Sequence, residues 1–291
     1  MTRPGRCRAI PLPREGRESY RESCLMSNAI QDCAPVRPVA PYFGGKRNLA
    51  GRIVPRLRAI PHHLYLEPFV GMGGVFLRRD FISPVEVIND ASGDVATLFR
   101  VLQRHFNALC DMLRWQVTSR EEFERLRAQS AETLTDLERT VRFLYIQRVG
   151  FGGKIAGRSF GASRTQAARF DVTKLVPMLE ETHRRLARVT IERLPWADAI
   201  TRYDTPGTLM YLDPPYWGHE EDYGKNLFSR ADFECMAGVL AGIKGRFVLS
   251  LNDCPGVREC FRSFTLEPVE TTYSNGREGA AKVAKELLIS N

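Results

Sequence analysis

The chain of 291 residues is long enough to bury one full core and a smaller second domain. No apolar stretch approaches the ~20 residues that a membrane-spanning helix needs, so we expect no membrane partner. The net charge of +8 favours a polyanionic partner such as nucleic acid. The seven cysteines show no metal-ligand spacing, so we expect reduced thiols, a cytoplasmic location and no bound metal.

Residues 1–38 form an arginine-rich, basic extension that we expect to be disordered. The extension lacks the apolar middle of a secretory signal. Two interpretations stay open: an over-long start with Met26 as the true initiator, and an arm that grips DNA.

The next part of the chain predicts the first half of a doubly wound α/β sheet. A glycine turn that ends in Lys46 precedes a short helix over 49–57. Strands follow over 64–70 and 85–88, separated by the glycine turn 71–74 and a helix that begins at Val75. Apolar residues at helical spacing from 95 to 102 predict the next helix. Strand, glycine turn, helix, strand and acid is the order of a nucleotide-binding half-fold.

Residues 105–175 interrupt this pattern and predict an inserted, mainly helical domain, with a capping box at Ser119 and Glu122. The stretch 141–170 contains no acidic residue and interleaves aromatic side chains with cations. These cations are Arg142, Arg148, Lys154, Arg158, Arg164 and Arg169. Because cations bind phosphates and rings stack on bases, we expect nucleic-acid contact here, with an ordinary basic surface loop as the alternative.

The α/β pattern resumes after the insertion, so residues 39–104 and 176–291 are predicted to form one domain. Strands are expected over 189–194, 208–212, 247–251 and 287–289. A helix is expected to begin at a second capping box, Ser229 and Asp232, and to stop at Gly245. The predicted strand ends carry Glu67, Asp90, Asp213 and Asp253. Ligands of such sheets bind beyond these ends, so we expect the acids to share one crevice.

The tetrapeptide Asp213-Pro214-Pro215-Tyr216 follows the buried strand 208–212. Each proline fixes its own φ and removes a backbone donor, and the residue before each is pushed toward extended geometry. A carboxylate and carbonyl acceptors are then left beside an aromatic ring. This arrangement suits a planar heterocyclic amine.

The segment Gly71-Met72-Gly73-Gly74 lets the backbone pass close to a ligand. Phe76 stands where GxGxxG has its last glycine, which disfavours a dinucleotide-dependent oxidoreductase. Asp90 follows about twenty residues later, as in folds that bind a ribose through an acid. A helix-capping role is the alternative for Asp90.

Together these motifs resemble the Dam-like adenine-specific DNA N6-methyltransferases, which carry DPPY in the alpha-type motif order. The resemblance covers roughly residues 40–290. It includes the stretch 67–74, the amino-terminal motif with Tyr42 and Lys46, Ser250-Leu251-Asn252-Asp253, Ser274-Asn275-Gly276-Arg277 and Glu286-Leu287-Leu288. It implies a Rossmann-like sheet that binds S-adenosyl-L-methionine (AdoMet), with an inserted DNA-recognition domain at 105–175.

The resemblance also implies site residues. The expected catalytic residues are Asp213, Pro214, Pro215 and Tyr216. The expected AdoMet contacts are Tyr42, Lys46, Glu67, Phe69, Gly71, Gly73, Asp90 and Asp213. The expected DNA contacts are Arg148, Lys154, Arg158 and Arg164. The stretch 148–153 departs from the family's Arg-Tyr-Gly-Tyr-Asn-Gly at Val149 and Gly152, which leaves open the bases that it reads.

The implied reaction transfers a methyl group from AdoMet to the N6 amine of an adenine flipped out of duplex DNA. We expect a prokaryotic or phage-like, cytoplasmic and monomeric enzyme. Two alternatives stay open: methylation of cytosine N4, and a DNA-binding module without catalysis. Restriction-modification, solitary and phage roles are equally compatible with the sequence.

Overall fold

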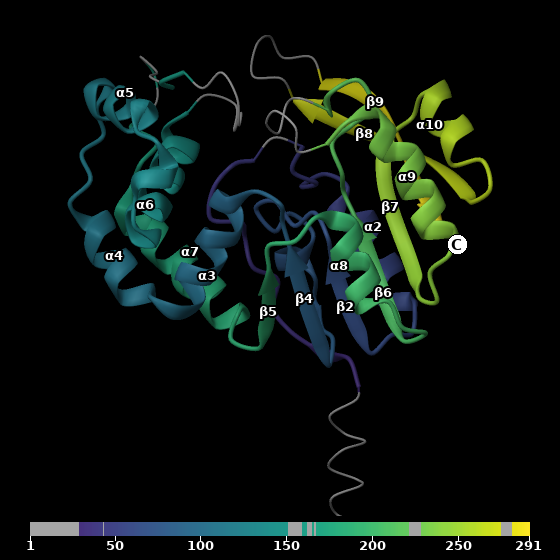
Figure 1. The fold of residues 1–291 in the computed structure, drawn as a ribbon. Coiled ribbons are helices and arrows are strands. Elements are labelled where there is room, and N and C mark those ends of the chain that lie inside the picture. The colour runs from purple at the N-terminus through teal and green to yellow at the C-terminus, as the bar shows by residue number, and fades with distance from the viewer. Residues whose placement is uncertain are drawn as a thin grey trace, which may run out of the picture.

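The computed structural model describes residues 29–42, 44–150, 159–161, 165, 167–220, 228–274 and 281–291, without the side chains of 272–274 and 281–283. Its centre is a seven-stranded sheet in the order β5-β4-β2-β6-β7-β9-β8 (Figure 1). The strands are β2 (Leu64–Glu67), β4 (Val85–Asn89), β5 (Val189–Glu192), β6 (Thr208–Leu212), β7 (Arg246–Asn252), β8 (Thr265–Ser274) and β9 (Ala281–Ser290). The first five strands of this order are parallel, and β9 is antiparallel to both of its neighbours. This architecture confirms the expected Rossmann-like α/β class.

Both faces of the sheet are buried, because alternate side chains of each strand enter two separate apolar clusters. In β6, Leu209 and Tyr211 enter one cluster and Met210 and Leu212 the other. Figure 1 places α8 (Trp196–Tyr203) and α9 (Arg230–Ala241) on one face and α2 (Ala50–Ala59) on the other. A continuous apolar run such as 208–212 is therefore the expected sequence of a strand covered on both sides.

The chain order creates a switch point in the middle of the sheet. From β2 the chain proceeds outward to β4 and β5, then returns to the other side of β2 to form β6 and β7. The carboxyl ends of β2 and β6 therefore flank the position where such sheets bind ligands.

A group of helices lies beside the sheet beyond β5 (Figure 1). They are α3 (Gly93–Arg104), α4 (Phe106–Arg114), α5 (Arg120–Ala128), α6 (Asp136–Val149) and α7 (Val172–Arg185). The expected domain boundary at 175/176 falls inside α7, which is one continuous helix capped by Asp171. Leu175 and Leu179 on either side of that boundary are buried in the same cluster as Leu144 of α6. The inserted helices thus extend to Arg185, and the sheet resumes at β5.

Residues 29–38 differ from the expected disorder. Gln31–Asp32 form β1, which pairs antiparallel with β3 (Phe81–Ile82), and the Val36 amide donates to the Leu77 carbonyl at 2.7 Å. These contacts fasten the segment to the main domain. The rest of the expected extension, residues 1–28, lies outside the described residues.

The helix expected from Val75 is a single 3-10 turn, η1 (Phe76–Arg78). The chain turns away at Arg79, whose guanidinium is buried and donates to Glu86 at 2.6 Å. After Arg79 the chain enters β3, which pairs with β1. This strand pairing stands where the continuation of a helix was expected. The predicted capping box is present at Ser229 for α9. At α5 only half of the predicted box forms: the Ser119 side chain accepts from the Glu122 amide, but the Glu122 carboxylate pairs with Arg125. No helix among the described residues is long and apolar enough to span a membrane.

Candidate active site at the carboxyl ends of the strands

Asp213 follows β6 directly and forms the centre of a buried polar cluster with Lys46, Tyr216, Ser250 and Glu286, here called the Asp213 cluster. Lys46 Nζ lies 2.8 Å from Asp213 Oδ1, donates to the Tyr216 hydroxyl at 2.5 Å and lies 4.2 Å from the centre of the Tyr216 ring. Glu286 Oε2 is 3.8 Å from the same ammonium. The Lys46 side chain is 1% exposed, so Lys46 is not a simple surface cation.

The ionisation of Asp213 is set by two opposing effects. Burial raises the pKa of its carboxyl and the Lys46 ammonium lowers it, and the net result is a rise from 3.8 to about 6. Ser250 on β7 also donates to Asp213 Oδ1 at 3.3 Å, and its hydroxyl shares a hydrogen bond of 3.0 Å with Tyr211. At neutral pH Asp213 is therefore mainly an ionised hydrogen-bond acceptor, and its side chain is 20% exposed.

The turn that carries Asp213 and Tyr216 is fixed at both ends. Pro214 and Pro215 are buried. Beyond the tetrapeptide, Asn252 at the end of β7 accepts from the Trp217 amide at 2.9 Å and donates to the Trp217 carbonyl at 3.1 Å. The Trp217 ring packs so closely on Gly256 that a Cβ there would lie 2.2 Å from it. Trp217 thus acts as a packing residue, as does Trp196, which donates to Asp232 at 3.2 Å.

The glycine turn after β2 is held against Asp90 and Tyr42. Gly71 and Gly73 have φ of 50° and 74°, a conformation that side chains disfavour. Asp90 accepts from the amides of Gly71 and Ser92, each at 2.9 Å, and burial raises its pKa to about 6. A Cβ on Gly71 would lie 3.0 Å from the Tyr42 ring. The structure thus brings Tyr42, the glycine turn and Asp90 together.

Glu67, the last residue of β2, is 1% exposed and accepts from the Tyr65 hydroxyl at 2.6 Å. Burial, together with the nearby Asp213 charge, raises the pKa of Glu67 from 4.5 to about 8, even though the Tyr65 hydrogen bond and the Arg79 charge lower it. Glu67 is therefore mainly neutral at pH 7. Phe69 is half-buried, and its ring stacks on Trp196 with centroids 6.3 Å apart.

Several expected site residues are placed differently or lie outside the described residues. Asp253 forms two hydrogen bonds with Arg258 of α10 (Pro255–Cys260), at 2.6 and 2.7 Å, which lower its pKa, so it does not join the acids of the crevice. Arg148 is half-buried, and its Nη1 donates to the Val39 carbonyl at 2.6 Å. Lys154, Arg158 and Arg164 lie outside the described residues, so their role stays a prediction.

Three residues of the site were not singled out for a role by the sequence: Asn252, Ser250 and Glu286. Asn252 and Ser250 lie at the polar end of β7. Glu286 lies on the neighbouring strand β9 and pairs in register with Asn252. Polar residues at the ends of neighbouring strands were the available signal. The antiparallel pairing that brings Glu286 to the site could not be seen without the topology.

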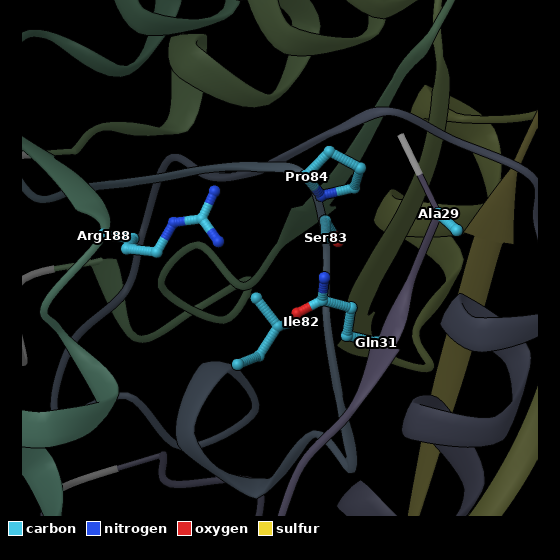
Figure 2. Close-up of a pocket in the computed structure, with 6 residues that line it drawn as sticks. All are labelled: Ala29, Gln31, Ile82, Ser83, Pro84 and Arg188. Carbon is cyan, nitrogen blue, oxygen red and sulfur yellow. The ribbon is translucent and has the colours of Figure 1, made fainter. Parts of the chain in front are cut away.

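Two further features of the described chain bear on the location of the site. The described residues contain no group of three or more metal-ligating side chains. A small pocket has a volume of about 40 Å³. Figure 2 shows the residues that line it, Ala29, Gln31, Ile82, Ser83, Pro84 and Arg188. Ser83 and Pro84 precede β4, so this pocket lies at its amino end, away from the Asp213 cluster.

Comparison with known proteins gives a consistent result. A family model described as D12 class N6 adenine-specific DNA methyltransferase matches residues 42–275. The type II methyltransferase M1.LlaDCHI of Lactococcus lactis subsp. cremoris is 25% identical over 275 residues, covering 88% of this chain and 95% of that protein. The DNA adenine methylase of Escherichia coli (strain K12) is 25% identical over 259 residues, covering 82% and 92%. M.CviBI of Paramecium bursaria Chlorella virus NC1A is 20% identical over 262 residues, covering 88% and 100%.

Proposed function

The chain belongs to the D12 class of N6 adenine-specific DNA methyltransferases, and we propose that Asp213 and Tyr216 hold the target adenine while the crevice between β2 and β6 holds AdoMet. Adenine-specific methylation follows from the family. The roles of individual residues are inferred from their geometry and from the physical chemistry below.

The residues around the glycine turn fit AdoMet. Gly71 and Gly73 carry no Cβ, so the backbone of the turn can approach a ligand closely at these two positions, and the Tyr42 ring lies against Gly71. The Asp90 carboxylate has one backbone donor on each oxygen, so each oxygen retains acceptor capacity for a ribose hydroxyl. Phe69 and Glu67, at the end of β2, are further proposed AdoMet contacts. When bound, AdoMet supplies an electrophilic methyl group on a positively charged sulfur.

The chemistry required of the protein is placement of a weak nucleophile. The adenine amine is poorly nucleophilic because its lone pair is delocalised into the ring. Asp213 and the Pro214 carbonyl would accept its two hydrogens and draw the nitrogen toward tetrahedral geometry, with the lone pair free to react. Because Pro214 and Pro215 are buried and rigid, the acceptors are preorganised and need little rearrangement.

One observation supports this site above the others: the Lys46 ammonium already donates to Asp213 and lies over the Tyr216 ring. The cluster therefore binds an N–H donor beside an aromatic face, which is what the adenine amine and its ring present. Tyr216 stacking on the base would contribute ~1–3 kcal/mol, as in other base–aromatic stacks. We propose that the adenine amine takes the Asp213 contact when Lys46 moves aside.

Duplex DNA is the proposed substrate, and the target base must leave the stack to reach a crevice at the ends of buried strands. The inserted helices and the basic stretch 141–170 are proposed to bind the flanking DNA. An enzyme of this kind acts in the cytoplasm of a prokaryotic or phage-infected cell, and we expect it to be a monomer.

Analysis of the product nucleoside tests this proposal. Purified protein, AdoMet labelled on its methyl group and DNA of mixed sequence should yield labelled N6-methyladenine. Labelled N4-methylcytosine would identify a different acceptor. DNA binding without any labelled nucleoside would favour a module without catalysis.

A further inference from the structure

The carboxyl end of α6 is fastened to the chain segment that precedes the cofactor motif. Gln147 Nε2 donates to the Pro41 carbonyl at 2.9 Å, and Arg148 Nη1 donates to the Val39 carbonyl at 2.6 Å. Gln147 and Val39 are each 1% exposed, so the contact is internal. These two hydrogen bonds, here called the α6 brace, join the inserted helices to the amino-terminal segment.

The braced segment leads directly into the site. Pro41 is followed by Tyr42, whose ring packs against Gly71, and then by Lys46, which reaches Asp213. A shift of the backbone at Val39 and Pro41 would therefore move Tyr42, beside the proposed AdoMet position, and Lys46, beside the proposed adenine position.

The same helix also contacts the other side of the proposed AdoMet crevice. Arg139 on α6 donates to Asp94 in the first turn of α3 at 2.6 Å. Asp94 comes shortly after Ser92, whose amide is held by Asp90. One rigid helix thus touches both the Tyr42 segment and the segment that follows Asp90.

Arg148 is poorly suited to a phosphate contact in this arrangement. Arg148 is half-buried, burial lowers its pKa, and its Nη1 already donates to the Val39 carbonyl. We propose that Gln147 and Arg148 are positioning residues, which set Tyr42 and Lys46 for AdoMet binding and methyl transfer and couple them to the inserted helices. This inference rests on the proposed function of the crevice and assigns Arg148 a different role from the expected DNA contact.

Three matched substitutions on α6 test the brace. Arg148→Met and Gln147→Met keep most of the side-chain volume but remove the donors. Arg142→Met is the control, because among the described residues the Arg142 guanidinium donates to two carbonyls of α5, Leu126 at 2.7 Å and Arg127 at 3.5 Å. Circular dichroism checks folding, and Gln147→Met carries the test if Arg148→Met does not fold.

Each brace variant should weaken AdoMet binding by about threefold to tenfold when measured by calorimetry without DNA, since one hydrogen bond contributes about 0.5–1.5 kcal/mol. Amide hydrogen exchange over 39–46 should become faster in the cofactor-free protein. The slope of log Kd for DNA against log salt should stay as in the wild type. Arg142→Met should leave both the AdoMet affinity and the exchange rates unchanged.

Unchanged AdoMet affinity and exchange in the brace variants would overturn the inference. If the salt slope of Arg148→Met also became shallower by about one, Arg148 would be a phosphate contact. If Arg148→Met changes both the AdoMet affinity and the salt slope, the Gln147→Met variant decides whether the brace positions the site. The Gln147 side chain is 1% exposed and cannot reach a phosphate. A wild-type protein that fails to bind AdoMet would instead contradict the proposed function itself.

Discussion

Lys46 Nζ lies 2.8 Å from Asp213 Oδ1, and the ammonium opposes the effect of burial, which leaves the pKa of this carboxyl raised to about 6. The two residues are far apart in the sequence, and the fold brings them together at the switch point between β2 and β6. The charge of Lys46 therefore helps to keep Asp213 ionised, and ionised Asp213 is the acceptor that the proposed chemistry needs.

The pH dependence of methyl transfer should report this pair. In the wild type the single-turnover rate should fall as the pH drops through about 6, because a protonated Asp213 carboxyl is a weaker acceptor for the adenine amine hydrogen. Lys46→Met removes the charge that lowers the pKa of Asp213, so the acidic limb should move to higher pH. The pH at which the rate falls is read from the shape of the pH profile, so it does not depend on the absolute rate of either protein. An acidic limb at the same pH in both proteins would show that Lys46 does not control Asp213.

Glu67 should make the free energy of unfolding pH-dependent. Its pKa is 4.5 in the unfolded chain and about 8 in the folded protein, so the folded state binds more protons between these values. The contribution of Glu67 to stability therefore decreases as the pH rises from about 4.5 to 8. Glu67→Gln keeps an acceptor for the Tyr65 hydroxyl but cannot ionise, so it should be more stable than the wild type at pH 8.

Urea unfolding at about pH 5 and pH 8 measures this effect through the difference between the two proteins. The stability of Glu67→Gln relative to the wild type should increase between the two pH values. A difference that stays constant would mean that Glu67 titrates normally in the folded protein.

The glycine turn should tolerate no side chain at Gly71. Gly71→Ala places a Cβ at a φ of 50° and 3.0 Å from the Tyr42 ring. Strain of this kind costs about 1–3 kcal/mol, so AdoMet affinity should fall by about tenfold or more. Calorimetric titration with AdoMet measures the loss.

Gly51→Ala in α2 is the matched control for Gly71→Ala. A Cβ at Gly51 meets nothing within 4 Å, and alanine suits a helix better than glycine by about 0.5–1 kcal/mol. This variant should be slightly more stable and should bind AdoMet as the wild type does. Equal AdoMet affinities in the two alanine variants would count against a cofactor role for the turn.

The sequence predicted the parts of the fold that rest on local pattern. The strand 208–212 was predicted at its observed bounds, because a strand buried on both faces is a continuous apolar run. The capping box of Ser229 and Asp232 marked the start of α9, because its hydrogen bonds are local.

Features that depend on tertiary contacts were missed. Strand β8 was not predicted, because an edge strand carries mixed polar residues and even a proline, Pro268. The segment 29–38 gave no local signal, since its order comes from pairing with β3. Asp253 followed a strand, as expected, but Arg258 one helical turn further on pairs with it.

The central claim is that the Asp213 carboxylate, at the carboxyl end of β6, activates the adenine amine. Single-turnover methylation of DNA by Asp213→Asn and by Asp253→Asn tests it most directly, since both variants exchange a strand-end carboxylate for an amide of equal shape. Asp213→Asn should lose about 10²–10³-fold in rate while its DNA affinity stays near that of the wild type. Asp253→Asn should stay within about threefold, because Asp253 is paired with Arg258 outside the cluster. Wild-type rates in Asp213→Asn would contradict the account.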